Sequence, residues 1–434
     1  MHTLVITNDF PPNTGGIETF VAEMVNQFPP DEVTVLASTR APFTAEQASR
    51  ADAALPYQVV RHPARTLWPT RSMARFAAAI ARGVQADAIW FGSAAPFALI
   101  ARELSRRLGG VRIVATTHGH EVWWAAAPGT RQALRRIGDS VDVLTYLTDY
   151  TRQRIAKALS PAAAARMARL PGAVCLPAAD AVRPPDSVPS AGPHPGAASA
   201  NQEGAPSVAA DAASPAPAPL TPGLPKAELS MPAPAPSPDG AGAREDGPVV
   251  LCVSRLVPRK GQDQLIRGWP EVVAAHPGAR LVIAGAGPYG AKLRRMAAAS
   301  PAASSIELTG RVEDARLAEL YAAAAVFAMP CRSRLLNLEV EGLGIVYLEA
   351  SAAGVPVVAG DSGGAPDAVL EGKTGFVVDG RRWQPAAARI IELLDNPAQA
   401  AAMGAAGREW VRRDWTWPSR YQTLSALLHP RASG

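Results

Sequence analysis

Short apolar runs alternate along the chain with longer stretches in which apolar residues recur at helical spacing. The short runs are typical of strands buried on both faces of a parallel sheet, and the longer stretches have the period of amphipathic helices. This alternation predicts an α/β fold with doubly wound sheets. The predicted strands are residues 4–7, 33–37, 59–60, 88–91, 112–116, 143–147, 249–253, 280–284, 306–309, 326–329, 356–359 and 376–378. The predicted helices are residues 17–28, 72–85, 97–108, 151–159, 263–269, 317–324, 345–353, 386–394 and 410–428, the last interrupted at Pro418.

One stretch breaks the alternation and divides the chain. Residues 181–247 hold fifteen prolines and no Phe, Tyr, Trp or Ile. Such a segment buries too little apolar area to offset the entropy of ordering it, so we expect a disordered insert, with a proline-rich docking ligand as the alternative. The expected organisation is a first domain at 1–179, the insert at 180–247, a second domain at 248–409 and a C-terminal helix at 410–434 that packs back on the first domain.

An acidic and glycine-rich stretch opens one of the predicted helices. Glu341 precedes Gly342, Leu343 and Gly344, the helix begins at Ile345 and contains Glu349, and Gly354 is placed to end it as a left-handed cap. Free N–H groups and the positive dipole end at a helix start favour an anion. The two acids are therefore predicted to reach different parts of one ligand whose diphosphate rests on the glycines. An ordinary helix with a glycine-rich entry is the alternative.

Three further places combine loops with groups suited to an anionic ligand. Gly15 and Gly16 follow the first strand and begin a helix, where backbone can approach a phosphate closely. Arg255 and Lys260 lie around the turn that follows residues 249–253, so both are expected to face one diphosphate. The cluster at 118–121, which begins with His118, ends another strand, where ligands of such sheets bind. A metal site is disfavoured there because so short a turn cannot easily converge three ligands.

Composition narrows the classes of function. The net charge is +5, the pI is about 9.3 and the chain has three cysteines without short spacing, which argues against a disulfide framework or a zinc site. No motif typical of nucleic-acid-binding proteins occurs, so nucleic acid is not an expected partner. The N-terminus lacks the basic start and apolar core of a signal peptide, and no apolar run has the length of a membrane span. A cytoplasmic enzyme, peripheral at most on the inner face of the membrane, is expected.

Taken in order, these motifs resemble glycosyltransferase family 4, whose two acids are separated by seven residues. The resemblance implies the GT-B architecture of two Rossmann-like domains around an interdomain cleft. The resemblance covers nearly the whole chain outside residues 180–247. It is closest to the GDP-mannose-dependent phosphatidylinositol-mannoside mannosyltransferases of actinobacteria. The segments that carry it are 8–18, 118–121, 254–263 and 340–350.

That resemblance implies a role for each candidate residue. Arg255 and Lys260 would hold the donor diphosphate. The other substrate-binding residues would include Gly16, Gly342, Leu343, Gly344 and Ile345. Glu349 would bind the ribose, and Val312 would contact the base. His118 and Glu341 would be the catalytic residues at the transferred hexose. The family retains anomeric configuration and needs no metal or other cofactor, and attack on the face of the leaving diphosphate is implied.

The acceptor is less sharply indicated. The resemblance points to a phosphatidylinositol-mannoside lipid at an anionic membrane surface, which the arginines and tryptophans of the first domain would contact; scattered solvated arginines and core tryptophans are the alternative. Residues 332–339 lack the glycine run of close relatives, and residues 171–174 lack an aspartate that is usual there. A soluble or secondary-metabolite acceptor therefore remains an alternative. A non-catalytic nucleotide-sugar binder is another alternative, but the intact cations and acids argue against it.

Overall fold

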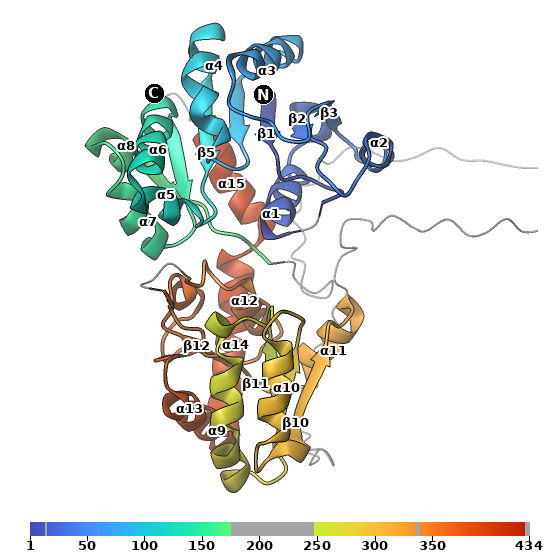
Figure 1. The fold of residues 1–434 in the computed structure, drawn as a ribbon, viewed down its shortest axis with the longest axis vertical. Coiled ribbons are helices and arrows are strands. Elements are labelled where there is room, and N and C mark those ends of the chain that lie inside the picture. Colours follow the sequence, from blue (N-terminus) through green and yellow to red (C-terminus); the bar gives the residue numbers. More distant parts are fainter. Residues whose placement is uncertain (14, 175–246, 336–338, 430–434) are drawn as a thin grey trace, which may run out of the picture.

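A computed structural model describes residues 1–13, 15–174, 247–335 and 339–429, which form two α/β domains stacked along the long axis of the molecule (Figure 1). Each domain is built on one parallel sheet, as the alternation of apolar runs predicts. The predicted insert at 180–247 lies outside the described residues except for Gly247.

The first domain has a seven-stranded sheet in the order β3-β2-β1-β4-β5-β6-β7. Its central strands are fully buried; Val5 of β1, for example, pairs with Val35 of β2 and Trp90 of β4. The prediction missed the edge strand β7, whose short sequence has no buried residue. The strands are β1 Thr3–Thr7, β2 Val33–Ser38, β3 Gln58–His62, β4 Ala88–Phe91, β5 Arg112–Thr116, β6 Val143–Tyr146 and β7 Met167–Arg169.

Helices cover both faces of this sheet. Several begin at a threonine whose hydroxyl accepts from a backbone N–H of the first turn, as Thr70 does from Met73 and Thr148 from Thr151. The helices are α1 Gly16–Val25, α2 Ala45–Asp52, α3 Arg71–Gly83, α4 Ala101–Arg107, α5 Glu121–Ala126, α6 Pro128–Ser140, α7 Asp149–Ala156 and α8 Pro161–Ala165. The prediction missed α2, α5, α6 and α8, which contribute few buried side chains.

The second domain has a six-stranded sheet in the order β10-β9-β8-β11-β12-β13. Its helix α9 continues past Pro270, where the sequence predicted an end. The strands are β8 Val249–Val253, β9 Arg280–Ala284, β10 Ile306–Gly310, β11 Ala324–Met329, β12 Val357–Gly360 and β13 Gly375–Val378. The helices are α9 Gln262–Ala275, α10 Gly290–Ala298, α11 Asp314–Ala323, α12 Ile345–Ala352, α13 Trp383–Asp395 and α14 Pro397–Asp414.

The C-terminal part of the chain returns to the first domain. The prediction of one helix over 410–428 with a break at Pro418 is wrong, because α14 continues to Asp414 and α15 spans Trp417–Leu428. The break falls at residues 415–416, where Thr416 caps α15 and Pro418 lies in its first turn, a position that needs no N–H donor. Trp410 of α14 is buried in the hydrophobic core of the second domain (the second core). Leu424 of α15 is buried in a hydrophobic core of the first domain (the first core).

Direct contacts join the two domains where the chain crosses between them. The N–H of Val174 donates to the carbonyl of Trp415 at 3.0 Å, so the two crossings are bonded to each other. The carboxylate of Asp367 in the second domain accepts from the N–H of Asp149 at 3.0 Å and pairs with Arg169 at 3.4 Å. The structure thus shows a defined contact between the start of α7 and the turn after β12.

We expect Leu424→Ala to lower the free energy of unfolding by about 2–5 kcal/mol, because the side chain is fully buried in the first core and its removal leaves a cavity. Gln422→Ala, on the exposed face of the same helix, should change it by less than about 0.5 kcal/mol. Denaturant unfolding of the full chain measures both. Equal values for the two variants would show that α15 is not part of the first core.

Candidate active site

The site lies where the carboxyl ends of both sheets face each other, with the start of α12 directed toward the first domain (Figure 1). Gly344, at φ +81°, is the left-handed residue that begins α12, and a Cβ there would lie 2.5 Å from the Tyr347 ring. Gly354, at φ +77°, follows the end of the helix. The predicted helix and its glycine cap are therefore confirmed.

Glu341 is buried and paired with two cations from the loop after β8. Its Oε2 lies 2.6 Å from Nζ of Lys260 and 3.0 Å from Nη1 of Arg259. The side chains of Lys260 and Glu341 are 11% and 8% exposed, so water screens this pair poorly. The predicted residues Lys260 and Glu341 thus lie in direct contact, together with Arg259, to which the sequence analysis assigned no role.

Arg255 lies on the same loop, but its side chain is exposed. Its carbonyl accepts from the amide of Gln262 at 3.1 Å, and the same amide donates to Ser254 at 2.8 Å, so the loop is held against the start of α9. A methyl group placed on Gly342 or on Gly16 would meet nothing within 4 Å. Both glycines therefore border open space, in which a ligand can approach the backbone.

A second buried ion pair holds the cationic loop, residues 254–261 between β8 and α9, in place. Asp263 pairs with Arg332 at 2.9 Å, and their side chains are 4% and 13% exposed. The backbone N–H of Arg332 donates to the carbonyl of Arg259 at 2.8 Å. Gly261, at φ +79°, lies so close to the carbonyl of Pro330 that a Cβ would come within 2.0 Å of it. The positions of Arg259 and Lys260 are thereby fixed relative to the segment that leads to Glu341.

Glu349 lies half-buried one helical turn after the start of α12. Its Oε2 accepts a hydrogen bond from the hydroxyl of Tyr321 at 2.9 Å. Val312, the predicted base contact, is half-buried and packs against the second core beside the exposed Arg311. Tyr321 is a residue that sequence reasoning missed, because nothing local marks a buried tyrosine of α11 as the partner of an acid on α12.

His118 follows β5 in the first domain, and its surroundings keep the ring neutral. Its Nε2 donates to the carbonyl of Gly92 at 2.6 Å, which leaves Nδ1 as the acceptor of the neutral ring. Burial lowers the pKa of His118 to about 4. The ring also packs edge-on against Phe20, with ring centroids 5.1 Å apart.

Glu121 organises the backbone of the histidine loop, residues 117–120 between β5 and α5. Its Oε2 accepts from the N–H groups of His118 at 3.0 Å and of Gly119 at 3.1 Å. Its side chain is fully buried, and burial raises the pKa of the carboxyl group. Among the described residues, no group of His, Cys, Asp and Glu side chains is arranged to hold a metal ion. Glu121 instead shapes the turn that presents His118.

The two halves of the site meet at Gly172. A methyl group placed on that residue would lie 3.1 Å from Cδ1 of Ile345 and 3.9 Å from the ring of Phe20, which in turn contacts His118. Ile345, in the first turn of α12, is 39% exposed although it is apolar. The start of α12 and the histidine loop are therefore separated by only a few side chains.

Comparisons with known proteins show which family the chain resembles. Residues 14–174 match the family described as Glycosyltransferase Family 4, and residues 237–410 match Glycosyl transferases group 1. The GDP-mannose-dependent monoacylated alpha-(1-6)-phosphatidylinositol monomannoside mannosyltransferase of Corynebacterium glutamicum is 40% identical over 98% of this chain and 97% of its own. The GDP-mannose-dependent alpha-(1-6)-phosphatidylinositol monomannoside mannosyltransferase of Mycolicibacterium smegmatis is 42% identical over 99% of this chain and 98% of its own. The chain belongs to glycosyltransferase family 4.

Solved structures support the fold of this glycosyltransferase. The Anabaena protein HepE in complex with UDP superimposes with a TM-score of 0.66 at 15% identity and covers 99% of both chains. The sucrose-phosphate synthase of Thermosynechococcus elongatus gives a TM-score of 0.62 at 18% identity and covers 98% of both chains. The predicted GT-B architecture is confirmed.

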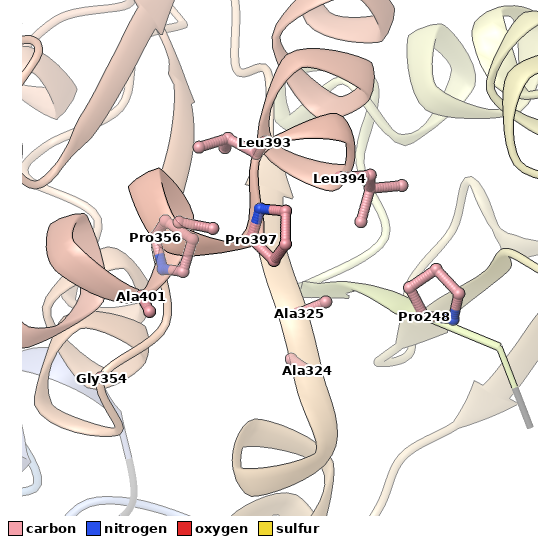
Figure 2. A pocket seen from close by; sticks show the side chains of 10 residues that line it. Pro248, Ala324, Ala325, Gly354, Pro356, Leu393, Leu394, Pro397 and Ala401 are labelled. Carbon is pink, nitrogen blue, oxygen red and sulfur yellow. The ribbon is translucent and has the colours of Figure 1, made fainter. Parts of the chain in front are cut away.

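An apolar hollow of about 300 Å³ in the second domain of the glycosyltransferase lies away from this site (Figure 2). Its wall includes Pro248, Ala324 and Pro356, which stand at the amino ends of β8, β11 and β12. Ligands of parallel sheets bind outside the opposite, carboxyl ends. The charged groups at those carboxyl ends, and not the hollow, therefore mark the candidate active site.

The neutral state of His118 makes the stability of the glycosyltransferase depend on pH. Because the pKa of the folded state, about 4, lies below the ordinary value of 6.5, the unfolded chain binds the proton first as pH falls. His118 should therefore cost the folded state about 2 kcal/mol between pH 7 and pH 5. Denaturant unfolding at both pH values measures this loss, and His118→Gln should remove that share of it.

His62→Gln serves as the control, since His62 lies outside this loop on β3. The His118-dependent loss should persist in that variant. An equal loss in wild type and His118→Gln would contradict the assignment of a neutral ring with a lowered pKa.

Proposed function

We propose that this glycosyltransferase moves a mannosyl group from GDP-mannose to a phosphatidylinositol-mannoside lipid, with retention of anomeric configuration. The observation that carries the proposal is the identity of 40–42% over nearly the whole chain with enzymes that are named for this donor and acceptor. The loop after β8, Glu341 before α12 and Glu349 within that helix supply the matching chemistry.

The diphosphate of the donor fits the charge of the loop after β8. Arg259 and Lys260 pair with the single carboxylate of Glu341, and Arg255 adds a third positive charge on the same loop. In the proposed complex the diphosphate pairs with these cations in place of Glu341. The carboxylate of Glu341 then accepts hydrogen bonds from hexose hydroxyls. The same cations stabilise the negative charge that develops on the leaving diphosphate, so the mechanism calls for no metal.

The sugar of the donor would lie between Glu341 and His118. Retention follows if the acceptor hydroxyl attacks the face from which the diphosphate leaves, with a phosphate oxygen taking its proton. Nδ1 of the neutral His118 is an acceptor suited to a hexose hydroxyl, and the bond from Nε2 to Gly92 fixes its direction. Glu349 would accept from the ribose, and Val312 would contact the base.

The assignment is tested by incubating the purified enzyme with GDP-mannose and a phosphatidylinositol monomannoside extract. Mass spectrometry should show a lipid product heavier by one hexose, and cleavage by an α-mannosidase should establish its configuration. Transfer of the hexose to a soluble acceptor but not to the lipid would contradict the proposed lipid acceptor. Transfer of a hexose from another nucleotide sugar, but not from GDP-mannose, would contradict the proposed donor.

In the same assay, Lys260→Ala and Arg255→Ala should each lower kcat/KM by a factor that corresponds to about 2–4 kcal/mol of transition-state stabilisation, the scale of one preorganised charge contact. Arg295→Ala, which removes an exposed arginine of α10, is the matched control and should leave kcat/KM unchanged. Wild-type kinetics in both site variants would refute the donor-site assignment.

We also propose that the first domain binds an anionic membrane surface where the lipid acceptor is presented. Trp68 and Trp123 are 63% and 49% exposed, which departs from the alternative of core tryptophans. Both follow the carboxyl ends of strands, as the site does, and Arg65, Arg71 and Arg75 are exposed near Trp68 in sequence. Tryptophan favours a membrane interface and basic residues favour anionic lipid. No helix among the described residues is long and apolar enough to cross a bilayer.

Vesicle co-sedimentation tests this surface. At low salt the wild-type protein should sediment with vesicles that contain phosphatidylinositol, and high salt should release it. Replacing Arg65, Arg71 and Arg75 with Gln should weaken binding by about 1 kcal/mol per residue. Leu335→Ala, at a comparably exposed apolar residue of the second domain, is the control. Wild-type protein that stays in the supernatant at low salt would refute the proposed surface.

A further inference from the structure

The hydroxyl of Tyr321 lies beneath the half-buried acid of α12. Tyr321 belongs to α11 and is 2% exposed, and its hydroxyl donates to Oε2 of Glu349 at 2.9 Å. The two residues are 28 positions apart in the chain, so only the packing of α11 and α12 on the sheet brings them together. The contact therefore depends on tertiary structure rather than on a local motif.

The ring of Tyr321 has a fixed place. It packs against Phe327 of β11 at 6.0 Å between ring centroids, and Phe327 packs against Tyr347 of α12 at 5.9 Å. Burial, and after it the charge of Glu349, raise the pKa of Tyr321 far above its ordinary value. The hydroxyl therefore keeps its proton throughout the working range of pH and remains a donor toward the carboxylate.

Tyr347 shows what a buried tyrosine of this core does when it serves packing. It is fully buried, and its hydroxyl donates to the backbone carbonyl of Met329 at 2.7 Å. Tyr321 instead donates to the carboxylate of a side chain that reaches the surface of the site. A carboxylate has about four acceptor positions, and a fixed donor at one oxygen restricts its rotation and sets the direction of the rest.

We propose that Tyr321 is a positioning residue for the donor ribose, acting by holding the carboxylate of Glu349 in the orientation that accepts a ribose hydroxyl. The inference rests on the proposed function, in which Glu349 receives the ribose. A preorganised carboxylate binds without the cost of ordering its side chain. Tyr321 thus contributes to nucleotide affinity although it does not itself contact the donor.

The test uses GDP and its 2′-deoxy and 3′-deoxy analogues, whose affinities are measured by calorimetry with the full-length enzyme. Wild type should bind GDP about tenfold more tightly than the analogue that lacks the contacted hydroxyl, the scale of a hydrogen bond to a charged group. Tyr321→Phe should bind GDP about tenfold more weakly than wild type does but bind that analogue equally well. In turnover, the same variant should raise KM for GDP-mannose and leave kcat within about twofold.

Tyr347→Phe is the matched control, since it removes an equally buried hydroxyl that donates to backbone, and it should keep the wild-type ratio between GDP and the analogue. Glu349→Asp is a second test of the same contact. Its shorter side chain cannot hold both contacts, so this variant should also lose the difference in affinity between GDP and the analogue. Equal weakening of GDP and analogue by Tyr321→Phe, or no weakening, would overturn the inference. Mannosyl transfer by wild type, measured separately, decides the proposed function whatever this outcome.

Discussion

The ion pair between Lys260 and Glu341 is the contact on which the second half of the site depends. It joins the loop after β8 to the segment before α12 at 2.6 Å, with both side chains nearly withdrawn from water. Removing one partner of such a pair leaves an uncompensated charge, which is far more costly than the pair is favourable. The backbones around it must approach closely, and glycines allow this: a Cβ on Gly363 would lie 2.1 Å from the carbonyl of Glu341. Charge and close packing therefore constrain the same few residues.

The first domain contributes a neutral polar group to the candidate site rather than an ion pair. His118 has no ionic partner in the described structure, and its direction comes from a backbone carbonyl and an aromatic ring. The carboxylate of Glu121 binds backbone N–H groups of the loop rather than the imidazole of His118. The first domain thus contributes an acceptor with little charge, and the second domain contributes a cluster of cations. In the proposed complex the first suits hydroxyl groups and the second suits a diphosphate.

The sequence predicted the elements that have strong apolar contrast and the residues that local motifs mark. The parallel sheets, the start of α12 at Ile345 and its end near Gly354 are confirmed. Contacts between distant positions escaped prediction: Arg259 and Glu341 are 82 residues apart, and Arg332 and Asp263 are 69 apart. No periodicity encodes which buried acid a given arginine meets, because that depends on how loops from different strands converge. The weakly apolar helix α6 and the short edge strand β7 were not predicted, because their sequences lack a clear pattern of apolar residues.

Chain order and spatial order disagree at α15. Leu424 and Leu428 complete a core in which many other members, such as Val35 and Trp90, lie in the first hundred residues. Synthesis proceeds from the N-terminus, and domains generally fold as they emerge. The first domain is therefore made first but completed last, after the whole second domain has been translated. Until then the surface that α15 covers stays open, so the nascent chain carries an exposed apolar face for most of its time on the ribosome.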